Sequence, residues 1–134
     1  HLIVRTSLNY GTSPTGDRAF NEEMLAAVRA GRRQKLFTDE FRCPIAVEDT
    51  ARLIWALIGA AATGTHHVAG GERLSRWEIG QRLLRRHPEL AGQLEPASLR
   101  EFSGPPRAPD TSLDCGKTER LLGEAMPRFL SPER

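Results

Sequence analysis

The sequence LIVRTSLNYG at residues 2–11 is the stretch that decides the expected fold. Leu2, Ile3 and Val4 form an apolar run rich in β-branched residues, which is typical of a buried strand in a parallel sheet. Polar residues and a glycine follow this run, as expected for a loop at the end of a strand. Because a domain seldom opens in the middle of such a strand, we expect further strands of the same sheet to precede it.

Helical and extended segments alternate along the rest of the chain. Phe20, Met24 and Val28 recur with helical spacing, which predicts an amphipathic helix within residues 17–30. The other expected segments are extended pieces at 35–37 and 43–47, a helix from Glu48, a strand at 66–71, a helix at 76–86 opened by a Ser75–Glu78 capping box, an extended loop at 95–109, and a helix at 117–122 ended by Gly123. This alternation, without internal repeats, predicts an α/β fold.

The composition is that of an ordinary globular protein of modest size. Its 134 residues suffice for one small domain or for a piece of a larger one. The 19 basic and 17 acidic residues are too balanced to indicate a nucleic-acid or membrane partner. Cys43 and Cys115 lie far apart without a CxxC pattern, and no apolar run approaches the roughly 18 residues of a membrane span. We therefore expect a cytoplasmic protein.

Four segments carry a resemblance to a known family. They are LIVRTSLNYG at 2–11, DEFRCPIAVEDTA at 39–51, HVAGGERLSRWE at 67–78 and RAPDTSLD at 107–114. In this order they resemble the second half of the extended short-chain dehydrogenases, most closely the dTDP-4-dehydrorhamnose reductases and their sugar-nucleotide-binding relatives. The resemblance spans nearly the whole chain. It departs at Leu8, where rhamnose-type reductases often carry an aromatic residue, and this departure leaves the sugar unspecified.

The resemblance implies a division of the chain between two parts of one enzyme fold. Residues 1–11 would be a late strand and loop of a Rossmann-like NAD(P)-binding fold, and residues 48–71 a helix and strand that return to the same sheet. Residues 12–47 and 72–134 would form the small substrate-binding subdomain. The implied ligands are a nucleotide-sugar and NAD(P), with the cofactor held mainly by an N-terminal Rossmann half outside this chain. A homodimer is compatible with the resemblance.

The residues that perform the family's chemistry are not in this sequence. A dinucleotide cradle requires Gly-x-Gly-x-x-Gly, or Gly-x-x-Gly-x-x-Gly in this family, between a strand and a helix, and Gly64, Gly70 and Gly71 fit neither pattern. The proton donor of the family is the tyrosine of a Tyr-x-x-x-Lys pair, but the only tyrosine, Tyr10, is followed at that spacing by Pro14. We therefore assign no catalytic residue and expect no reductase activity from the 134-residue chain alone.

Polar residues after the first expected strand are candidates for ligand contacts. Thr6, Ser7 and Asn9 stand where a parallel strand ends, and ligands bind at this edge of open α/β sheets. The resemblance places Thr6 and Ser7 beside the cofactor and Asn9 beside the substrate. The alternative is ordinary turn chemistry, which also favours polar residues at this position.

Two arginines are candidates for the diphosphate of a nucleotide-sugar. Arg42 and Arg107 lie in the second and fourth resembling segments, and a guanidinium gives bidentate, permanently charged contact with phosphate oxygens. Pro44 is assigned to the substrate site with them, as the residue that shapes the loop. The alternative for both arginines is a solvated surface position.

Two further patterns favour structural explanations. Asp39 and Glu40 are neighbours in a turn, so they would not oppose each other across a bond as glycosidase carboxylates do. His66 and His67 would point to opposite faces of a strand, and no third ligand follows at metal-site spacing. We therefore assign no metal site.

Several functions remain open from the sequence. The first is the substrate-binding portion of an NAD(P)-dependent sugar-nucleotide reductase. Alternatives of the same fold are a related epimerase or dehydratase, or a non-catalytic nucleotide-sugar- or NADP-binding regulatory protein, such as the regulatory subunit of methionine adenosyltransferase. DNA binding through residues 74–86 is disfavoured, because no partner helix precedes this segment at helix-turn-helix spacing. A Tyr-x-x-x-Lys pair upstream would distinguish the enzyme from the regulatory protein.

Overall fold

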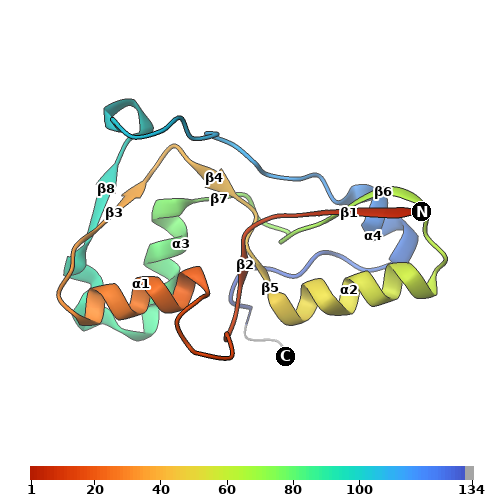
Figure 1. Cartoon of the computed structure of the whole chain (residues 1–134), viewed down its shortest axis with the longest axis horizontal. Helices are drawn as coiled ribbons and strands as arrows, with labels where there is room; N and C mark the ends of the chain where they lie inside the picture. Colours follow the sequence, from red (N-terminus) through yellow and green to blue (C-terminus); the bar gives the residue numbers. More distant parts are fainter. Residues whose placement is uncertain (132–134) are drawn as a thin grey trace. The chain divides into compact units, whose positions relative to one another are not determined.

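The computed structural model describes residues 1–131, and the chain divides into two compact units. Within the described residues, unit 1 comprises 1–10, 43–73 and 112–131, and unit 2 comprises 11–42 and 74–111. Each unit is therefore assembled from segments that are distant in the sequence (Figure 1). None of the helices in residues 1–131 is long and apolar enough to cross a membrane.

Unit 1 is built around two parallel strands. β1 (Leu2–Thr6) pairs with β6 (Gly64–Val68) in parallel, and Val4 stands opposite His66 (Figure 1). The two-residue strands β2 (Asn9–Tyr10) and β5 (Ile45–Ala46) form a second parallel pair. Two helices, α2 (Val47–Gly59) and α4 (Gly116–Leu122), pack beside these strands.

The core of unit 1 lies between α2 and the strands. Glu48 and Asp49 in the first turn of α2 complement the positive end of the helix dipole. Leu53 and Leu57, one turn apart on the helix, are fully buried and belong to a cluster with Val68 of β6. The other buried members of this cluster are Cys43, Ile45, Ala69, Cys115 and Met126.

Among the described residues, the first strand is covered on one face only. Leu2 and Val4 pack against the core cluster of unit 1, but Ile3 on the opposite face of β1 is 45% exposed. β1 pairs with β6 alone, so its other edge has no strand partner among residues 1–131. The parallel pairing predicted for this strand is confirmed.

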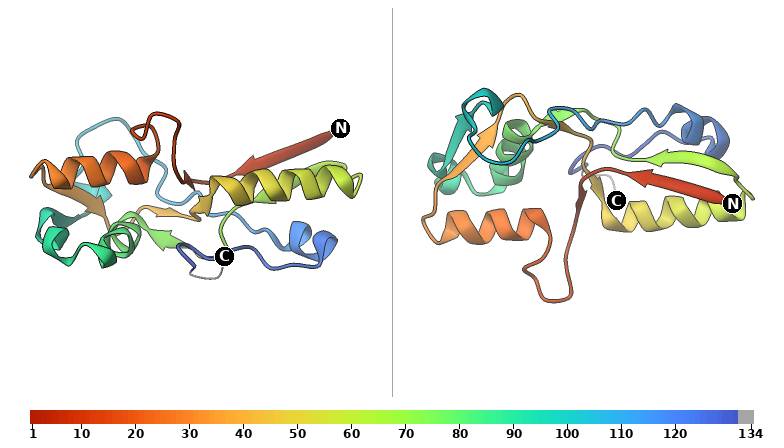
Figure 2. Two further views of the ribbon diagram at one scale, coloured as in Figure 1. Left: turned by 90° about the horizontal axis from the view of Figure 1, so that it is seen from below. Right: turned by 45° about the horizontal axis from the view of Figure 1, so that its top comes forward.

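Unit 2 contains the remaining helices and strands. β3 (Gln34–Phe37) and β8 (Leu94–Ala97) pair in parallel, whereas β4 (Phe41–Arg42) and β7 (Leu74–Ser75) pair in antiparallel fashion. The helices α1 (Phe20–Arg29) and α3 (Arg76–Leu83) lie beside the β3–β8 pair (Figure 2). Three short 3-10 helices complete the unit: η1 (Leu84–Arg86), η2 (Pro88–Gln93) and η3 (Leu99–Glu101). Its core cluster consists of Met24, Val28, Leu36, Leu84 and Leu94.

Local signals in the sequence agree with the structure at several helix ends. The Ser75 hydroxyl accepts from the Glu78 amide at 3.1 Å, and the Glu78 carboxylate accepts from the Ser75 amide at 2.8 Å, so the predicted capping box is confirmed. Gly123 ends α4 in the left-handed conformation at φ 69°. The first expected helix begins at Phe20 rather than near Asp17, because the Asp17 and Arg18 amides donate to the Ser13 hydroxyl instead.

Two features of the fold differ from the expected boundaries. Residues 95–109 were expected to be loop, yet β8 forms within them despite Pro96; a proline is tolerated because β8 pairs with β3 alone. Residues 112–131 belong to unit 1, because α4 packs on β6, although the resemblance implied that the whole of 72–134 lies in the substrate-binding subdomain.

Candidate functional site

The strands of unit 2 gather three arginines around one acidic residue. β4 runs beside β7, and the segment that follows Arg107 runs along the other side of β4, where the Phe41 amide donates to the Pro109 carbonyl at 2.7 Å. This arrangement collects Arg42, Arg76 and Arg107 around Glu40, although 67 residues separate the first and last members. We call these four residues the arginine cluster.

Glu40 is the centre of the arginine cluster and is fully buried, with 0% of its surface exposed. Its Oε1 accepts from Arg42 Nη2 at 2.6 Å and from Arg107 Nη2 at 2.8 Å. Its backbone carbonyl accepts from the Arg76 amide at 2.9 Å. A buried carboxylate in this setting is stabilised by charge-assisted hydrogen bonds to the two guanidinium groups.

The two arginines that contact the carboxylate are held differently. Arg42 Nη1 also donates to the carbonyl oxygens of Phe41 at 2.7 Å and Ala108 at 3.3 Å. Arg107 instead lies over two aromatic rings, 5.6 Å from the centroid of Phe37 and 5.9 Å from that of Phe102. The Arg107 side chain remains 43% exposed, so it is available to a ligand.

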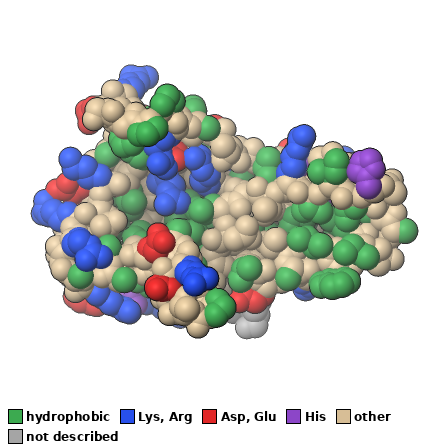
Figure 3. All heavy atoms as spheres, in the orientation of Figure 1, with side chains coloured by type: hydrophobic (Ala, Val, Ile, Leu, Met, Phe, Trp, Pro, Cys, Tyr) green, Lys and Arg blue, Asp and Glu red, His purple; other side chains and the backbone are tan. Residues whose placement is uncertain are grey.

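Positive charge exceeds negative charge within the cluster. Burial lowers the pKa of the Arg76 guanidinium; the Glu40 carboxylate raises it, and Arg42 and Arg107 lower it further. Three guanidinium groups thus lie close to one carboxylate, and two of them bond it directly, which leaves the cluster suited to an anion. On the face seen in Figure 3, Lys and Arg side chains gather mainly over unit 2, whereas hydrophobic side chains gather over the β1 end of unit 1.

Asp39 and Glu40 have separate roles, as their adjacency in a turn predicted. Asp39 accepts from the Ser98 hydroxyl at 2.7 Å and from the Leu99 amide at 2.8 Å, at the start of η3. These two hydrogen bonds, the Ser98 bond first, hold the pKa of the Asp39 carboxyl below its usual value. Glu40 is directed to the arginines, so the two carboxylates do not form a catalytic pair.

The polar residues after β1 are engaged within unit 1. The Ser7 hydroxyl accepts from the Cys43 amide at 3.1 Å. The Asn9 side chain donates to the Ser7 carbonyl at 3.0 Å and to the Thr6 hydroxyl at 3.4 Å, and it accepts from the Thr50 hydroxyl at 2.6 Å. These bonds link the end of β1 to the segment before β5 and to α2. The side chains of Thr6, Ser7 and Asn9 therefore stabilise this loop.

Pro44 has a structural position in unit 1. Its side chain is almost completely buried. A Cβ atom at Gly70 would lie 2.0 Å from the Pro44 carbonyl oxygen, and the Gly70 amide donates to the Cys43 carbonyl at 3.1 Å. Only a glycine permits this approach of the two chain segments. Any contribution of Pro44 to a binding site therefore comes from the loop shape and not from direct contact of its ring.

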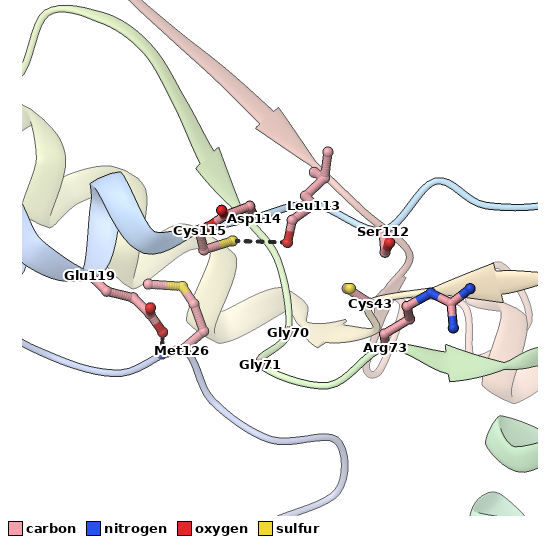
Figure 4. A pocket seen from close by; sticks show the side chains of 10 residues that line it. All are labelled: Cys43, Gly70, Gly71, Arg73, Ser112, Leu113, Asp114, Cys115, Glu119 and Met126. Carbon is pink, nitrogen blue, oxygen red and sulfur yellow. Dashed lines mark hydrogen bonds between the residues drawn. The ribbon is translucent and has the colours of Figure 1, made fainter.

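A pocket of about 390 Å³ also lies in unit 1 (Figure 4). It is lined by Cys43, Gly70, Gly71, Arg73, Ser112, Leu113, Asp114, Cys115, Glu119 and Met126. None of the candidate residues Thr6, Ser7, Asn9 and Pro44 lines it. Burial raises the pKa of the Cys115 thiol to about 11, so this thiol is protonated at neutral pH and is a poor nucleophile.

The histidines and the tyrosine make structural contacts. His66 Nδ1 lies 3.4 Å from the Thr118 hydroxyl, and His67 Nδ1 lies 2.8 Å from the Asp114 carbonyl. Within residues 1–131, no three His, Cys, Asp or Glu side chains are grouped as metal ligands. The Tyr10 hydroxyl accepts from the Leu130 amide at 3.1 Å, and its ring packs edge-on against Phe129.

The structure thus separates the candidate residues. Arg42 and Arg107 meet at one carboxylate in unit 2, whereas Thr6, Ser7, Asn9 and Pro44 belong to unit 1. Sequence reasoning missed Glu40 and Arg76 as members of the cluster. No local signal could have found them, because the antiparallel β4–β7 pair brings residues 40–42 and 74–76 together only in the folded chain.

A family model and one curated relative match this chain. The model for the RmlD substrate binding domain matches residues 1–131. A probable low-salt glycan biosynthesis reductase, Agl14, from Haloferax volcanii is 28% identical over 129 residues. The aligned part covers 94% of this chain but 43% of that relative, so the chain spans less than half the relative's length.

Solved structures share the fold. A dTDP-4-dehydrorhamnose reductase from Bacillus anthracis in complex with NADP is similar with a TM-score of 0.80, 25% identity, and coverage of 95% of this chain and 44% of that one. A hypothetical dTDP-4-dehydrorhamnose reductase from Sulfolobus tokodaii is similar with a TM-score of 0.77, 25% identity, and coverage of 96% and 44%. A dTDP-glucose 4,6-dehydratase from Bacillus anthracis shares the fold with a TM-score of 0.75 at 15% identity, covering 96% and 40%.

Proposed function

Because this chain belongs to the RmlD substrate binding domain family, we propose that it is the substrate-binding portion of an NAD(P)-dependent sugar-nucleotide reductase. The predicted fold class, the C-terminal part of an extended short-chain dehydrogenase, is confirmed by the family model and by the solved structures. The chain is thus a substrate-binding domain of the kind found in dTDP-sugar reductases. The reaction, the cofactor and the ligand-binding residues are proposals.

The arginine cluster is the observation that carries this proposal. A nucleotide-sugar presents a diphosphate with two negative charges, and the arginine cluster places three guanidinium groups near the single carboxylate of Glu40. Guanidinium groups bind phosphate oxygens in fork geometry, which gives both energy and orientation. We assign Arg42 and Arg107 to the diphosphate, and unit 2 to the substrate subdomain.

The cofactor part of the proposal rests on relatives. The Bacillus anthracis reductase binds NADP, as its structure contains it. NAD(P) supplies the hydride in such a reaction, but the residues of this chain do not form a dinucleotide cradle, because no glycine fingerprint joins a strand to a helix. We propose that Thr6 and Ser7 contact only the nicotinamide end of the cofactor. The Ser7 hydroxyl also accepts a hydrogen bond from the Cys43 amide. An N-terminal Rossmann half would hold the rest.

The reductase is favoured over other functions of this fold. The curated relative is a probable reductase, and two solved structures at 25% identity are dTDP-4-dehydrorhamnose reductases, whereas the similarity to the dehydratase concerns the fold alone. A non-catalytic regulatory protein of the same fold would share the binding surface without the chemistry. Assay of the full-length gene product with dTDP-4-dehydro sugars and NADPH distinguishes these cases, because a regulatory protein would bind without turnover.

The diphosphate site can be tested on the 134-residue chain by titration calorimetry with dTDP and with thymidine. Arg107→Ala is expected to weaken dTDP binding by about tenfold or more, since a charge-assisted hydrogen bond contributes roughly 1.5–3 kcal/mol. Thymidine lacks the phosphates, so its binding should not change. Arg107→Lys keeps the charge but loses the fork, and should give an intermediate loss.

Arg33→Ala is the matched control for this test. Arg33 is an exposed arginine of unit 2 that pairs with Glu95, away from the cluster. Its removal lowers the net charge by the same amount and should change dTDP affinity less than twofold. Equal effects of Arg33→Ala and Arg107→Ala would reject the assignment of the diphosphate to the arginine cluster.

A further inference from the structure

The two oxygens of the Glu40 carboxylate have unequal surroundings. Oε1 accepts from both Arg42 and Arg107, whereas Oε2 is buried and has no hydrogen-bond partner among the described residues. A buried carboxylate oxygen without a partner is unfavourable, and such an oxygen in a folded protein requires an explanation. The carboxylate is thus oriented to hold two guanidinium groups with a single oxygen.

The two arginines depend on Glu40 to different degrees. Arg42 retains its bonds to the Phe41 and Ala108 carbonyls without the carboxylate. Among residues 1–131, the polar partner of the Arg107 guanidinium is Glu40, and its ring contacts are the faces of Phe37 and Phe102. Without Glu40, the half-exposed Arg107 side chain would lose its hydrogen-bonded anchor and sample many rotamers.

Glu40 could influence an anion at this site in two opposite ways. As a negative charge close to the ligand, it would repel phosphate, and its removal would tighten binding. As an anchor, it would hold Arg107 in a ligand-ready position, and its removal would weaken binding because the side chain would have to be ordered on association. The sign of the change on removal therefore separates the two roles.

We infer that Glu40 is a positioning residue, which fixes Arg107 beside Arg42 so that the pair fits a diphosphate in preference to a single phosphate. This inference rests on the proposed diphosphate site and names the residue that organises it. Two guanidinium groups on one oxygen are held at a fixed separation, and two linked phosphoryl groups can use both, whereas a single phosphate gains less from their alignment.

The difference between the two carboxylate oxygens makes a clean substitution available. In Glu40→Gln, the amide oxygen can replace Oε1 as acceptor for both arginines, and the amide nitrogen can take the place of Oε2, which accepts from no donor among residues 1–131. This variant removes the charge and keeps the anchor. Glu40→Ala removes both. Glu95→Ala is the control, since Glu95 is an acidic residue of unit 2 that pairs with Arg33 outside the cluster.

The experiment measures binding of inorganic pyrophosphate and inorganic phosphate to the 134-residue chain and its variants by titration calorimetry at low ionic strength. Glu40→Ala is expected to bind pyrophosphate about tenfold more weakly than the wild type, despite the loss of a negative charge, and to lose the preference for pyrophosphate over phosphate. Glu40→Gln should bind pyrophosphate at least as tightly as the wild type. Glu95→Ala should stay within twofold of it.

Each outcome bears on a stated claim. Unchanged or tighter pyrophosphate binding by Glu40→Ala would overturn the positioning role while leaving the proposed site intact. A wild-type chain that fails to bind pyrophosphate would overturn the proposed site and this inference together. If Glu40→Ala does not fold, ¹⁵N spectra of the arginine guanidinium groups decide: a restrained Arg107 signal in both the wild type and Glu40→Gln supports the inference, and a freely rotating Arg107 in the wild type overturns it.

Discussion

Unit 1 and unit 2 differ in what their exposed surfaces offer. Unit 1 has a core of aliphatic residues between α2 and the β1–β6 pair, yet it exposes Ile3, Trp55 and Ile58 by 45%, 71% and 50%. Unit 2 buries a carboxylate among arginines and presents one of these arginines to solvent. Within the part of the chain that the structure describes, the first unit exposes apolar surface, and the second has positive charge in excess.

This difference indicates how the two units contribute to the chain. Exposed aliphatic and aromatic side chains favour contact with more protein, whereas a cluster of guanidinium groups favours a small anionic ligand. We therefore expect changes in the closely packed backbone of unit 1 to alter the free energy of unfolding. Changes in the charges of unit 2 should instead alter ligand affinity. Substitutions in each unit can test this contrast.

Replacement of Gly70 should have the largest effect, and it should fall on unit 1. A Cβ atom there would lie 2.0 Å from the Pro44 carbonyl oxygen, which is backbone and cannot rotate away. Gly70→Val is expected to lower the free energy of unfolding by about 3 kcal/mol or more, as overpacking at a closely packed position does. Urea unfolding followed by circular dichroism measures the loss, and hydrogen exchange locates it.

Gly92→Ala is the matched control in unit 2, because no atom lies within 4 Å of a Cβ added there. This change should alter stability by less than about 0.5 kcal/mol. For Gly70→Val, amide protection should fall mainly in residues 43–73 of unit 1. An equal loss throughout unit 2 would mean that the two units unfold as one, and the contrast in stability would not hold.

Replacement of Ile3 should have a smaller effect, on association and not on folding. An exposed aliphatic side chain on an open strand favours weak self-association of the chain at high concentration. Ile3→Thr keeps a β-branched side chain and should raise the dissociation constant by roughly threefold to tenfold, since part of an isoleucine burial is lost. Sedimentation velocity over a range of concentrations measures this change.

Lys35→Thr, an exposed strand position of unit 2, serves as the control for Ile3→Thr. It should leave the sedimentation behaviour unchanged. If the wild-type chain stays monomeric at all accessible concentrations, the apolar face of β1 does not drive self-association. The proposed contrast between the surfaces of unit 1 and unit 2 would then rest on the arginine cluster alone.

The features that could be predicted from the sequence are those encoded within a few residues. The capping box needs only Ser75 and Glu78, and the parallel strand that opens the chain needs only its own β-branched run. The missed strand β8 is recognisable only from its partner β3, which lies about 60 residues earlier. Pro96 disfavours a strand in the sequence, but a strand with a single partner, as β8 has in β3, can contain a proline.

The candidate site shows the same division between local and distant information. Arg42 and Arg107 could be proposed because each lies in a segment that resembles a known family. Glu40 and Arg76 could not, because their roles arise from the antiparallel β4–β7 pair and from the segment beside β4. The exposure of Ile3 agrees with the expectation that further strands of the sheet lie outside this chain, because burial depends on which segments cover a strand and not on the composition of the strand itself.

The smallest expected effect concerns acid stability and falls on unit 2. The Ser98 hydroxyl and the Leu99 amide hold the pKa of Asp39 below its usual value, and the Ser13 hydroxyl and the Ala19 amide do the same for the pKa of Glu22. A carboxyl whose pKa is lowered by folding stabilises the protein above its unfolded pKa, and this contribution is lost as the pH falls through the folded value. Unit 2 should therefore lose stability below about pH 4.

Asp39→Asn isolates this effect, because asparagine can still accept from the Leu99 amide but no longer titrates. The variant should lose less stability than the wild type between pH 5 and pH 3, as measured by urea unfolding with Trp77 of unit 2 as the fluorescent probe in a Trp55→Phe background. Glu101→Gln is the control, because Glu101 is an exposed carboxyl in η3, the 3-10 helix that Asp39 contacts. This variant should lose as much stability in acid as the wild type. Identical acid profiles for Asp39→Asn and the wild type would mean that the hydrogen bonds at η3 do not couple this carboxyl to folding, and that acid acts on unit 2 through other groups.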